Sequence, residues 1–195
     1  MMHTQFNTTQ QKGFTLIELM ITLSIAAILV SVAVPSFLTT MRNNSLVTYT
    51  NNLVSDINLA RSEAVKRGIR VVLCRSADPY ATAPTCGGTT NTWTSGWLIF
   101  ADADASGAFN AGDTLVRVGA PITGTAAIIS NSTTNNNLQY NPDGTTNESG
   151  STGVFVLCDD RGANNGRQIQ VNAMGRPRLV KGSDATLSCT TPTVV

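Results

Sequence analysis

Two arginines near the C-terminus have the type and spacing that suit phosphate binding. In the segment MGRPRLVKG, Arg176 and Arg178 are two residues apart, so on an extended strand both side chains would lie on one face. A guanidinium group can donate two parallel hydrogen bonds to a phosphate. Lys181 lies nearby, and Arg161 and Arg167 precede the pair. This pattern predicts contact with the backbone of duplex nucleic acid, independent of base sequence and weakened by salt.

The same residues also fit an ordinary solvated strand face. Salt bridges to Asp159, Asp160 or Asp184 would then neutralise them, and the sequence leaves both interpretations open. The patch contains no aromatic side chain to stack on bases, which favours duplex over single-stranded nucleic acid. The net charge of the whole chain is only +1, so any binding would depend on this local patch.

A second polar group, in the segment DADASGAFNAGD, resembles a calcium-binding loop. Its oxygen-bearing residues Asp102, Asp104, Ser106 and Asp113 occupy positions 1, 3, 5 and 12, with Gly107 at position 6. The flanking segments, however, have the composition of strands, and the last carboxylate belongs to an Asp and not to a bidentate Glu. Asp and Gly are also common in tight turns. We therefore expect a β-hairpin loop without a metal ion.

One carboxylate, Glu18, interrupts the apolar run FTLIELMITLSIAAILVSVAVP. The 21 residues from Phe14 to Val34 would form about 30 Å of helix, which matches the core of a bilayer. A charge at the centre of such a helix costs about 2.5–3.5 kcal/mol, so Glu18 has either a use or a place near the headgroups. Lys12 precedes the run and the next basic residue is Arg42, which predicts a cytoplasmic N-terminus.

The four cysteines favour two disulfides, since their number is even and the chain is expected to be exported. Three pairings are possible, and the local pairs Cys74–Cys86 and Cys158–Cys189 are favoured. The chain has no histidine after His3, which argues against a zinc site and against His-based activation of a nucleophile. Neither enzymatic activity nor a cofactor is expected.

These residues must be positioned by a long helix followed by strands. From residue 36 to residue 68 the pattern stays helical, with one apolar stripe of Leu46, Leu53, Ile57, Ala60 and Ala64. Pro35 should bend the helix and Gly68 should end it. Short β-type runs follow, namely RVVLC, GWLIFAD, TLVRVG, AAIIS, GVFVLC, RQIQVN and RPRLVK. The segment NSTTNNN, residues 131–137, is expected to be a polar loop.

The predicted fold class is therefore α+β. A long N-terminal transmembrane and stalk helix would pack on a globular domain made of an antiparallel β-sheet or β-sandwich. The expected divisions are a leader at 1–13, a membrane helix at 14–35, an amphipathic helix at 36–68, and a β-rich domain at 69–195.

The segment Lys12-Gly13-Phe14-Thr15-Leu16-Ile17-Glu18, with the apolar run and Pro35 after it, resembles the N-terminus of type IV prepilins and type II secretion pseudopilins. The resemblance implies that a prepilin peptidase cleaves between Gly13 and Phe14 and methylates the new amino group of Phe14. It also implies that residues 14–35 form the assembly helix of a filament. There Glu18 would pair with the α-amino group of Phe14 on a neighbouring subunit.

Later blocks are similar to the GspH/FimT family of minor pilins and pseudopilins. They are ARSEA, GWLIF, DADASGAFNAGDTLVRV, CDDRG and GRPR. The pattern Gly-Arg-x-Arg is similar to a motif associated with DNA capture in some FimT-type minor pilins. By this resemblance Gly175, Arg176 and Arg178 would bind DNA, with Lys181, Arg161 and Arg167 as weaker candidates.

The resemblance implies a minor pilin of a type IV pilus that binds extracellular double-stranded DNA for uptake in natural transformation. The alternative is a minor pseudopilin of a type II secretion system that contacts other pseudopilins and not DNA. In both cases the chain would be anchored in the bacterial inner membrane with its C-terminal domain in the periplasm. It would later be incorporated into a pilus or pseudopilus at the cell surface.

Overall fold

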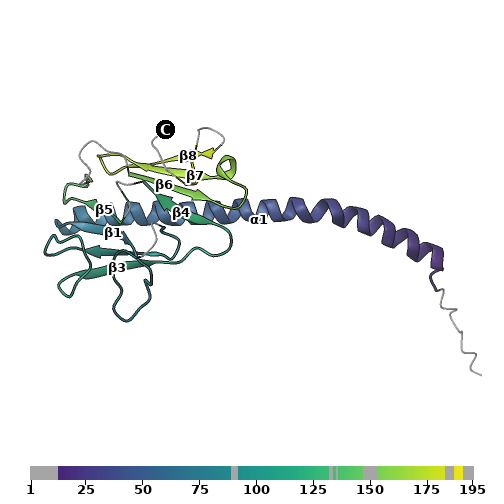
Figure 1. The fold of residues 1–195 in the computed structure, drawn as a ribbon, viewed down its shortest axis with the longest axis horizontal. Helices are drawn as coiled ribbons and strands as arrows, with labels where there is room; N and C mark the ends of the chain where they lie inside the picture. Colours follow the sequence, from purple (N-terminus) through teal and green to yellow (C-terminus); the bar gives the residue numbers. More distant parts are fainter. Residues whose placement is uncertain are drawn as a thin grey trace, which may run out of the picture. The chain divides into compact units, whose positions relative to one another are not determined.

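The computed structural model of the chain describes residues 13–88, 92–131, 134, 136–146, 153–182 and 187–190. The chain divides into two compact units, Met1–Met41 and Arg42–Val195. Helix α1 (Leu16–Arg67) contributes to both units (Figure 1). The elements after it are β1 (Val71–Arg75), β2 (Trp97–Ala101), β3 (Thr114–Gly119), β4 (Ala127–Ser130), β5 (Asn137–Tyr140), β6 (Gly153–Cys158), the 3-10 helix η1 (Ala163–Asn165), β7 (Arg167–Val171) and β8 (Pro177–Lys181). Of the expected leader, only Gly13 lies among the described residues.

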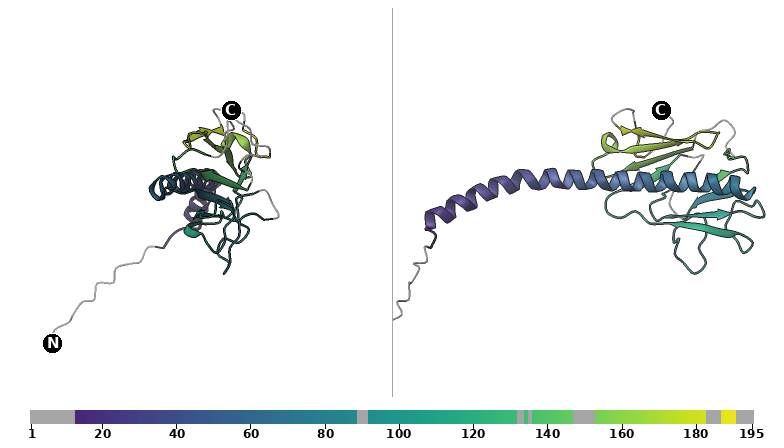
Figure 2. Two further views of the ribbon diagram at one scale, coloured as in Figure 1. Left: turned by 90° about the vertical axis from the view of Figure 1, so that its left-hand side faces the viewer. Right: turned by 180° about the vertical axis from the view of Figure 1, so that it is seen from behind.

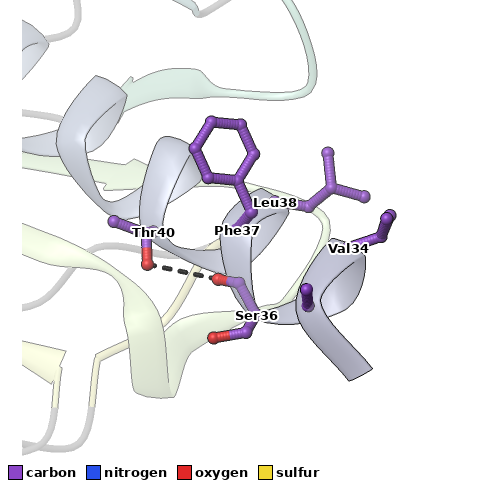
Figure 3. Close-up of a pocket in the computed structure, with 6 residues that line it drawn as sticks. Val34, Ser36, Phe37, Leu38 and Thr40 are labelled. Atoms are coloured by element: carbon purple, nitrogen blue, oxygen red, sulfur yellow. Dashed lines mark hydrogen bonds between the residues drawn. The ribbon is translucent and has the colours of Figure 1, made fainter. Parts of the chain in front are cut away.

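The first unit contains the apolar part of α1. An 18-residue window of this helix has a mean hydropathy of 2.4 and is not buried, so by length and composition the helix could cross a membrane. The helix continues through Pro35, which has no N–H to donate to the preceding turn. Just after it, the hydroxyls of Thr39 and Thr40 donate to the carbonyls of Pro35 and Ser36, at 3.0 and 3.1 Å. Figure 3 shows the second of these bonds beside the exposed apolar side chains of this stretch.

The second unit begins with the amphipathic half of α1. All members of the predicted stripe are buried, namely Leu46, Leu53, Ile57, Ala60 and Ala64. Gly68 adopts φ +66°, and its N–H donates to the carbonyl of Ala64 at 3.0 Å. A left-handed glycine at this position terminates the helix at Arg67, as the sequence predicted.

Two four-stranded antiparallel sheets follow, with strand orders β3-β2-β1-β5 and β4-β6-β7-β8. One hydrophobic core joins the stripe of α1 to the inner faces of both sheets. Figure 2 shows the course of α1 beside the strands of both sheets. Ile57 packs in this core with residues such as Ile99 from the first sheet and Phe155 from the second. The predicted α+β class, with a long helix packed on antiparallel sheets, is confirmed.

Part of the outer face of each sheet is also covered, in both cases beside a disulfide. Val72, Leu98 and Phe100 form a second apolar cluster around the Cys74–Cys86 bond. Val154 and Val156 form a third cluster around the Cys158–Cys189 bond. All residues of β1, β2 and β6 are therefore buried, whereas buried and exposed residues would alternate along an antiparallel strand with one face in solvent. These disulfides are the two local pairings favoured from the sequence.

One strand was not predicted. The sequence assigned residues 131–137 to a polar loop and identified no strand between this loop and the run GVFVLC, but β5 runs from Asn137 to Tyr140. Leu138 and Tyr140 are buried, whereas Asn137 and Gln139 are partly exposed, so the strand has the expected two-residue alternation. At four residues, two of them amides, the pattern was too short and too polar to stand out.

Candidate functional site

Arg176 and Arg178 lie where the β7–β8 hairpin returns along the edge of its sheet. Arg178 pairs with Gln170 in the register of β7 and β8. Arg176 precedes β8, yet it continues the pairing: its N–H donates to Oδ1 of Asn172 at 3.0 Å, and its carbonyl accepts from the N–H of Asn172 at 3.3 Å. Both arginines are exposed. If the alternation of β8 is extended back through the backbone hydrogen bond between Asn172 and Arg176, both side chains are assigned to the same face of the sheet.

The register separates Lys181 and Arg167 from this pair. Lys181 is opposite Arg167 in the register. Arg167 is two and four residues from Ile169 and Val171, which lie in the core, so it shares their face of the sheet. Lys181 and Arg167 therefore belong to the face of the sheet opposite the one that carries Arg178. Of the five basic candidates from the sequence, only Arg176 and Arg178 are thus assigned to the outer face of this sheet.

Arg161 is held by an ion pair. Its Nε lies 3.1 and 3.0 Å from the two carboxylate oxygens of Asp159, and its Nη2 lies 2.6 Å from Oδ2. The side chains of Arg161 and Asp159 are 15% and 3% exposed. Nη1 of Arg161 also donates to Oδ1 of Asn43 in α1 at 2.8 Å. The sequence left both phosphate binding and a salt bridge open for this residue, and in the structure Arg161 forms the salt bridge.

The charge of Arg161 changes the acidity of its partner. Burial alone would raise the pKa of Asp159, but hydrogen bonds from Arg161 and the charges of Arg161 and Arg42 outweigh it and hold this pKa below its ordinary value. Hydrogen bonding to Asp159 in turn raises the pKa of Arg161. By contrast, neither Arg176 nor Arg178 forms an ion pair with any residue that the structure describes. Asp184, the third possible acidic partner, lies outside the described residues.

The acidic loop between β2 and β3 uses most of its oxygen atoms on its own backbone. Asp102 accepts from the N–H groups of Ser106 and Gly107 at 3.0 and 2.9 Å, and Asp113 accepts from Ala103 and Asn110 at 3.0 and 2.9 Å. Carboxylate oxygens of Asp102, Asp104 and Asp113 lie within 4.8 Å of one another. Burial and then the charge of Asp113 are among the causes that raise the pKa of Asp102. In these contacts the acidic side chains stabilise the backbone of a β-hairpin loop.

Glu18 has a local structural role that the sequence prediction overlooked. Its carboxylate accepts from the N–H and the hydroxyl of Thr15 at 3.3 and 3.2 Å, and its own N–H donates to the Thr15 hydroxyl at 3.3 Å. Because α1 begins at Leu16, Thr15 and Glu18 form a reciprocal capping box at its first turn. The spacing Thr-x-x-Glu before an apolar run was the signal for it.

A buried carboxylate in the middle of α1 was also missed. Asp56 is 2% exposed, its Oδ2 accepts from the indole N–H of Trp97 at 2.8 Å, and its Oδ1 lies 3.1 Å from Nε of Arg117. These three residues line a cavity of about 150 Å³ together with Tyr49 and Asn52. Burial raises the pKa of Asp56, although the Trp97 hydrogen bond and the Arg117 charge oppose it. Asp56 does not belong to the apolar stripe predicted for this helix, so nothing local in the sequence indicated its burial.

Comparison with known proteins agrees with this architecture. Residues 49–175 match the model of the family described as "Type II transport protein GspH", and residues 8–34 match the model of the prokaryotic N-terminal methylation motif. No curated protein matches the chain significantly.

Two crystal structures of the type IV minor pilin FimU from Pseudomonas aeruginosa have a similar fold. The first has a TM-score of 0.59 at 22% identity and covers 77% of this chain and 98% of its own. The second has a TM-score of 0.56 at 22% identity and covers 74% of this chain and 99% of its own. The GspH model covers well over half of the 195 residues, and the chain therefore belongs to the GspH family of minor pilins and pseudopilins.

Proposed function

We propose that this protein is a minor pilin of a type IV pilus and that its globular unit binds double-stranded DNA through Arg176 and Arg178. The observation that carries the proposal is that Arg178, in the edge strand β8, and Arg176, just before it, are both exposed and have no ion-pair partner among the described residues. Two exposed guanidinium groups on one face suit adjacent phosphates of a nucleic-acid backbone. Binding of this kind supports uptake of extracellular DNA in natural transformation.

The other charged side chains support this choice of residues by contrast. Several cations of the globular unit lie within 4 Å of a carboxylate, namely Arg42, Lys66, Arg67, Arg70, Arg117 and Arg161. A cation already paired with a carboxylate gains less from a phosphate, because the first pair must be broken. Arg176 and Arg178 have no ion pair with a described residue that would have to be broken first.

Family membership and the methylation motif imply assembly with other pilins and processing by a prepilin peptidase. We place the cleavage between Gly13 and Phe14, so that residues 1–13 form the leader and Phe14 becomes the methylated N-terminus. The uncleaved N-terminus lies in the cytoplasm, because Lys12 precedes the apolar run and the next Lys or Arg is Arg42. The globular unit is then periplasmic until the subunit enters the filament.

In the filament, we assign Glu18 a pairing with the α-amino group of Phe14 on a neighbouring subunit. A buried pair of this kind sets the register between subunits more than it adds stability. The apolar helix from residue 14 to residue 35 supplies the packing, and Pro35 marks its end.

The second candidate is a minor pseudopilin of a type II secretion system. It is favoured by the description of the matching family as a type II transport protein. In that role the globular unit contacts other pseudopilins, and Arg176 and Arg178 form a solvated strand face.

An electrophoretic mobility shift with the full chain in detergent micelles and a duplex of random sequence tests the DNA proposal. The wild type should bind, and its affinity should fall steeply with salt. Arg176→Gln/Arg178→Gln should bind more weakly, with the slope of log K against log salt reduced by about 2, one for each lost phosphate contact.

The matched control is Arg167→Gln/Lys181→Gln, which removes the same charge from the opposite face of the same sheet. This variant should retain most of the affinity, with thermal unfolding used to check that it is folded. Equal loss of binding in both double variants would indicate attraction by net charge alone. No binding by the wild type would exclude the DNA proposal and favour the secretion role.

A further inference from the structure

The turn that carries Arg176 is fastened to two distant parts of the chain. The hydroxyl of Tyr140, at the end of β5, donates to the carbonyl of Gly175 at 3.1 Å. The N–H of Thr146 donates to the carbonyl of Ala173 at 3.0 Å. In α1, Nε of Arg61 donates to the carbonyl of Gly144 at 3.0 Å, which holds the loop between Tyr140 and Thr146 against the helix.

Gly175 is the point where these parts meet. It is buried and has φ +73°, a conformation that side-chain-bearing residues rarely adopt. A Cβ atom there would overlap the carbonyl oxygen of Gly144, and it would lie 2.6 Å from Cε1 of Tyr140 and 3.2 Å from Nε of Arg61. Gly175 is therefore required by packing and by backbone geometry. We call Arg61, Tyr140, Gly144 and Gly175 the hairpin anchor.

We propose that Arg61 and Tyr140 are positioning residues that hold Arg176 in its binding orientation, and that Gly175 serves this packing instead of contacting phosphate. The inference rests on the proposed DNA binding for its functional meaning. It reassigns the first residue of the Gly-Arg-x-Arg pattern, and it extends the site to helix α1, which lies far from that pattern in the sequence.

The chemistry of Tyr140 suits a permanent hydrogen bond. Tyr140 is fully buried, and burial raises the pKa of its hydroxyl, so the group stays protonated and can donate. A carbonyl that loses such a donor in the interior has no water to replace it. The turn is thereby restricted before any ligand arrives, and a preorganised side chain loses less conformational entropy on binding.

Arg61 differs from Arg176 and Arg178, whose side chains are exposed. Its Nε is committed to the carbonyl of Gly144, and it makes no ion pair with the described residues. Its effect could come from this hydrogen bond or from its charge. Arg61→Lys separates the two, because lysine keeps the charge but lacks the guanidinium Nε that the Gly144 carbonyl accepts from.

The test uses the full chain in detergent micelles and two readouts. Hydrogen exchange at the amides of Gly175 and Thr146 reports the anchor without any ligand, and both amides are bonded in the structure, to Asn172 and Ala173. Affinity for duplex DNA reports its functional effect. The variants are Tyr140→Phe, Gly175→Ala, Arg61→Lys and Arg61→Gln, and Arg178→Gln serves as the control that removes charge without touching the anchor.

In Tyr140→Phe and in both Arg61 variants, we expect exchange at the two amides to be roughly 2- to 10-fold faster, the range that one hydrogen bond represents. Gly175→Ala should have the largest effect, and the amide of Phe155 in β6 should be unchanged in all variants. DNA affinity should fall by a similar factor, with the salt slope unchanged because Arg176 and Arg178 are both present. Arg178→Gln should instead lower the salt slope and leave exchange unaltered.

Each result decides between these roles. Unchanged exchange in Tyr140→Phe and Gly175→Ala overturns the anchor. Faster exchange with wild-type DNA affinity overturns the positioning role, and wild-type behaviour of Arg61→Lys in both readouts overturns the role of the Nε hydrogen bond. Faster exchange in a protein whose wild type binds no DNA supports the anchor and rejects the DNA proposal, so the two failures are distinguishable.

Discussion

At the scale of single residues, the globular unit has two buried carboxylates, Asp56 and Asp159, whose pKa values move in opposite directions. The side chains of Asp56 and Asp159 are both 3% exposed. Asp159 receives several hydrogen bonds from a largely buried Arg161, which lowers its pKa despite burial. Asp56 faces Arg117, whose side chain is 52% exposed, so burial dominates and the pKa rises. The sign of the shift thus follows the geometry and solvation of the partner.

Replacing Asp159 should destabilise the globular unit. Asp159→Asn would leave Arg161 without its carboxylate, and breaking a buried pair by removing one partner costs about 3 kcal/mol. Because the pKa of Asp159 is lowered by folding, its contribution is present above the ordinary Asp pKa and is lost as pH falls through the folded-state pKa. Urea unfolding at several pH values should therefore show a deficit near pH 7 that shrinks in acid.

The neighbouring residue provides the control for that prediction. Asp160 pairs with Arg42 at 3.2 Å, and the two side chains are 45% and 43% exposed. Exposed pairs contribute about 0–1 kcal/mol, so Asp160→Asn should unfold almost as the wild type does. Similar losses in both variants would contradict the assignment of the stabilising pair to Asp159 and Arg161.

Replacing Asp56 should have the opposite effect. Asp56→Asn keeps an oxygen that can accept from Trp97 but removes a charge that burial disfavours. Since folding raises the pKa of Asp56, this group's contribution to stability is fully present below the ordinary Asp pKa and is lost as pH rises through the folded-state value. The variant should thus unfold at a higher temperature than the wild type at pH 7, with the gain vanishing near pH 3. A variant less stable at pH 7 would show that the Arg117 pair outweighs burial.

At the scale of elements, α1 has different surroundings in its two parts. In the globular unit its stripe of Leu53, Ile57 and neighbouring residues is buried by both sheets. In the first unit its apolar residues are exposed in the isolated chain, from Leu16 at 75% to Met41 at 51%. This part of the helix needs a lipid or protein environment, which agrees with the assembly that family membership implies.

The first turn of α1 allows the two roles of Glu18 to be separated. Glu18→Gln keeps the capping box, since Gln also occupies this position in such caps, but it removes the charge that would pair with Phe14 of a neighbouring subunit. Glu18→Ala removes both. If intersubunit pairing matters, both variants should lose incorporation into sheared filaments, as measured by immunoblotting, while remaining in the membrane fraction. Wild-type incorporation of Glu18→Gln would show that the cap alone accounts for this carboxylate.

At the scale of the whole molecule, charge is almost balanced. Thirteen Lys and Arg residues face twelve Asp and Glu residues in the sequence, so the protein as a whole has little attraction for a polyanion. Any affinity for DNA must then come from the local arrangement of Arg178 in β8 and Arg176 just before it. This makes the proposed binding sensitive to two substitutions and to salt.

The physiological role can be tested in the organism that encodes the chain. A deletion strain should lose transformation by added DNA and retain secretion of type II substrates. Complementation with the wild type should restore transformation, and Arg176→Gln/Arg178→Gln should fail to do so although it enters filaments normally. Loss of secretion with intact transformation would instead establish the pseudopilin role.

Features that depend on neighbours within a few residues could be predicted from the amino-acid sequence. The apolar stripe of α1, its glycine stop at Gly68, most of the strands and the α+β class follow from periodicity and turn chemistry, which act locally. The N-terminal motif around Glu18 is likewise contiguous, so its residues alone were enough to indicate the family. The capping box with Thr15 was also readable there.

Which charged side chains lie together became clear only from the folded chain, because it depends on strand register and on partners far along the sequence. Register places Lys181 and Arg167 opposite the face of Arg178, and Arg161 is bound to Asn43, 118 residues away. The burial of Asp56 and the pairing of the short strand β5 arise from packing that no local pattern records. The anchoring of Gly175 by Arg61 and Tyr140 is of the same kind, since distant segments must first be folded together before these atoms can meet.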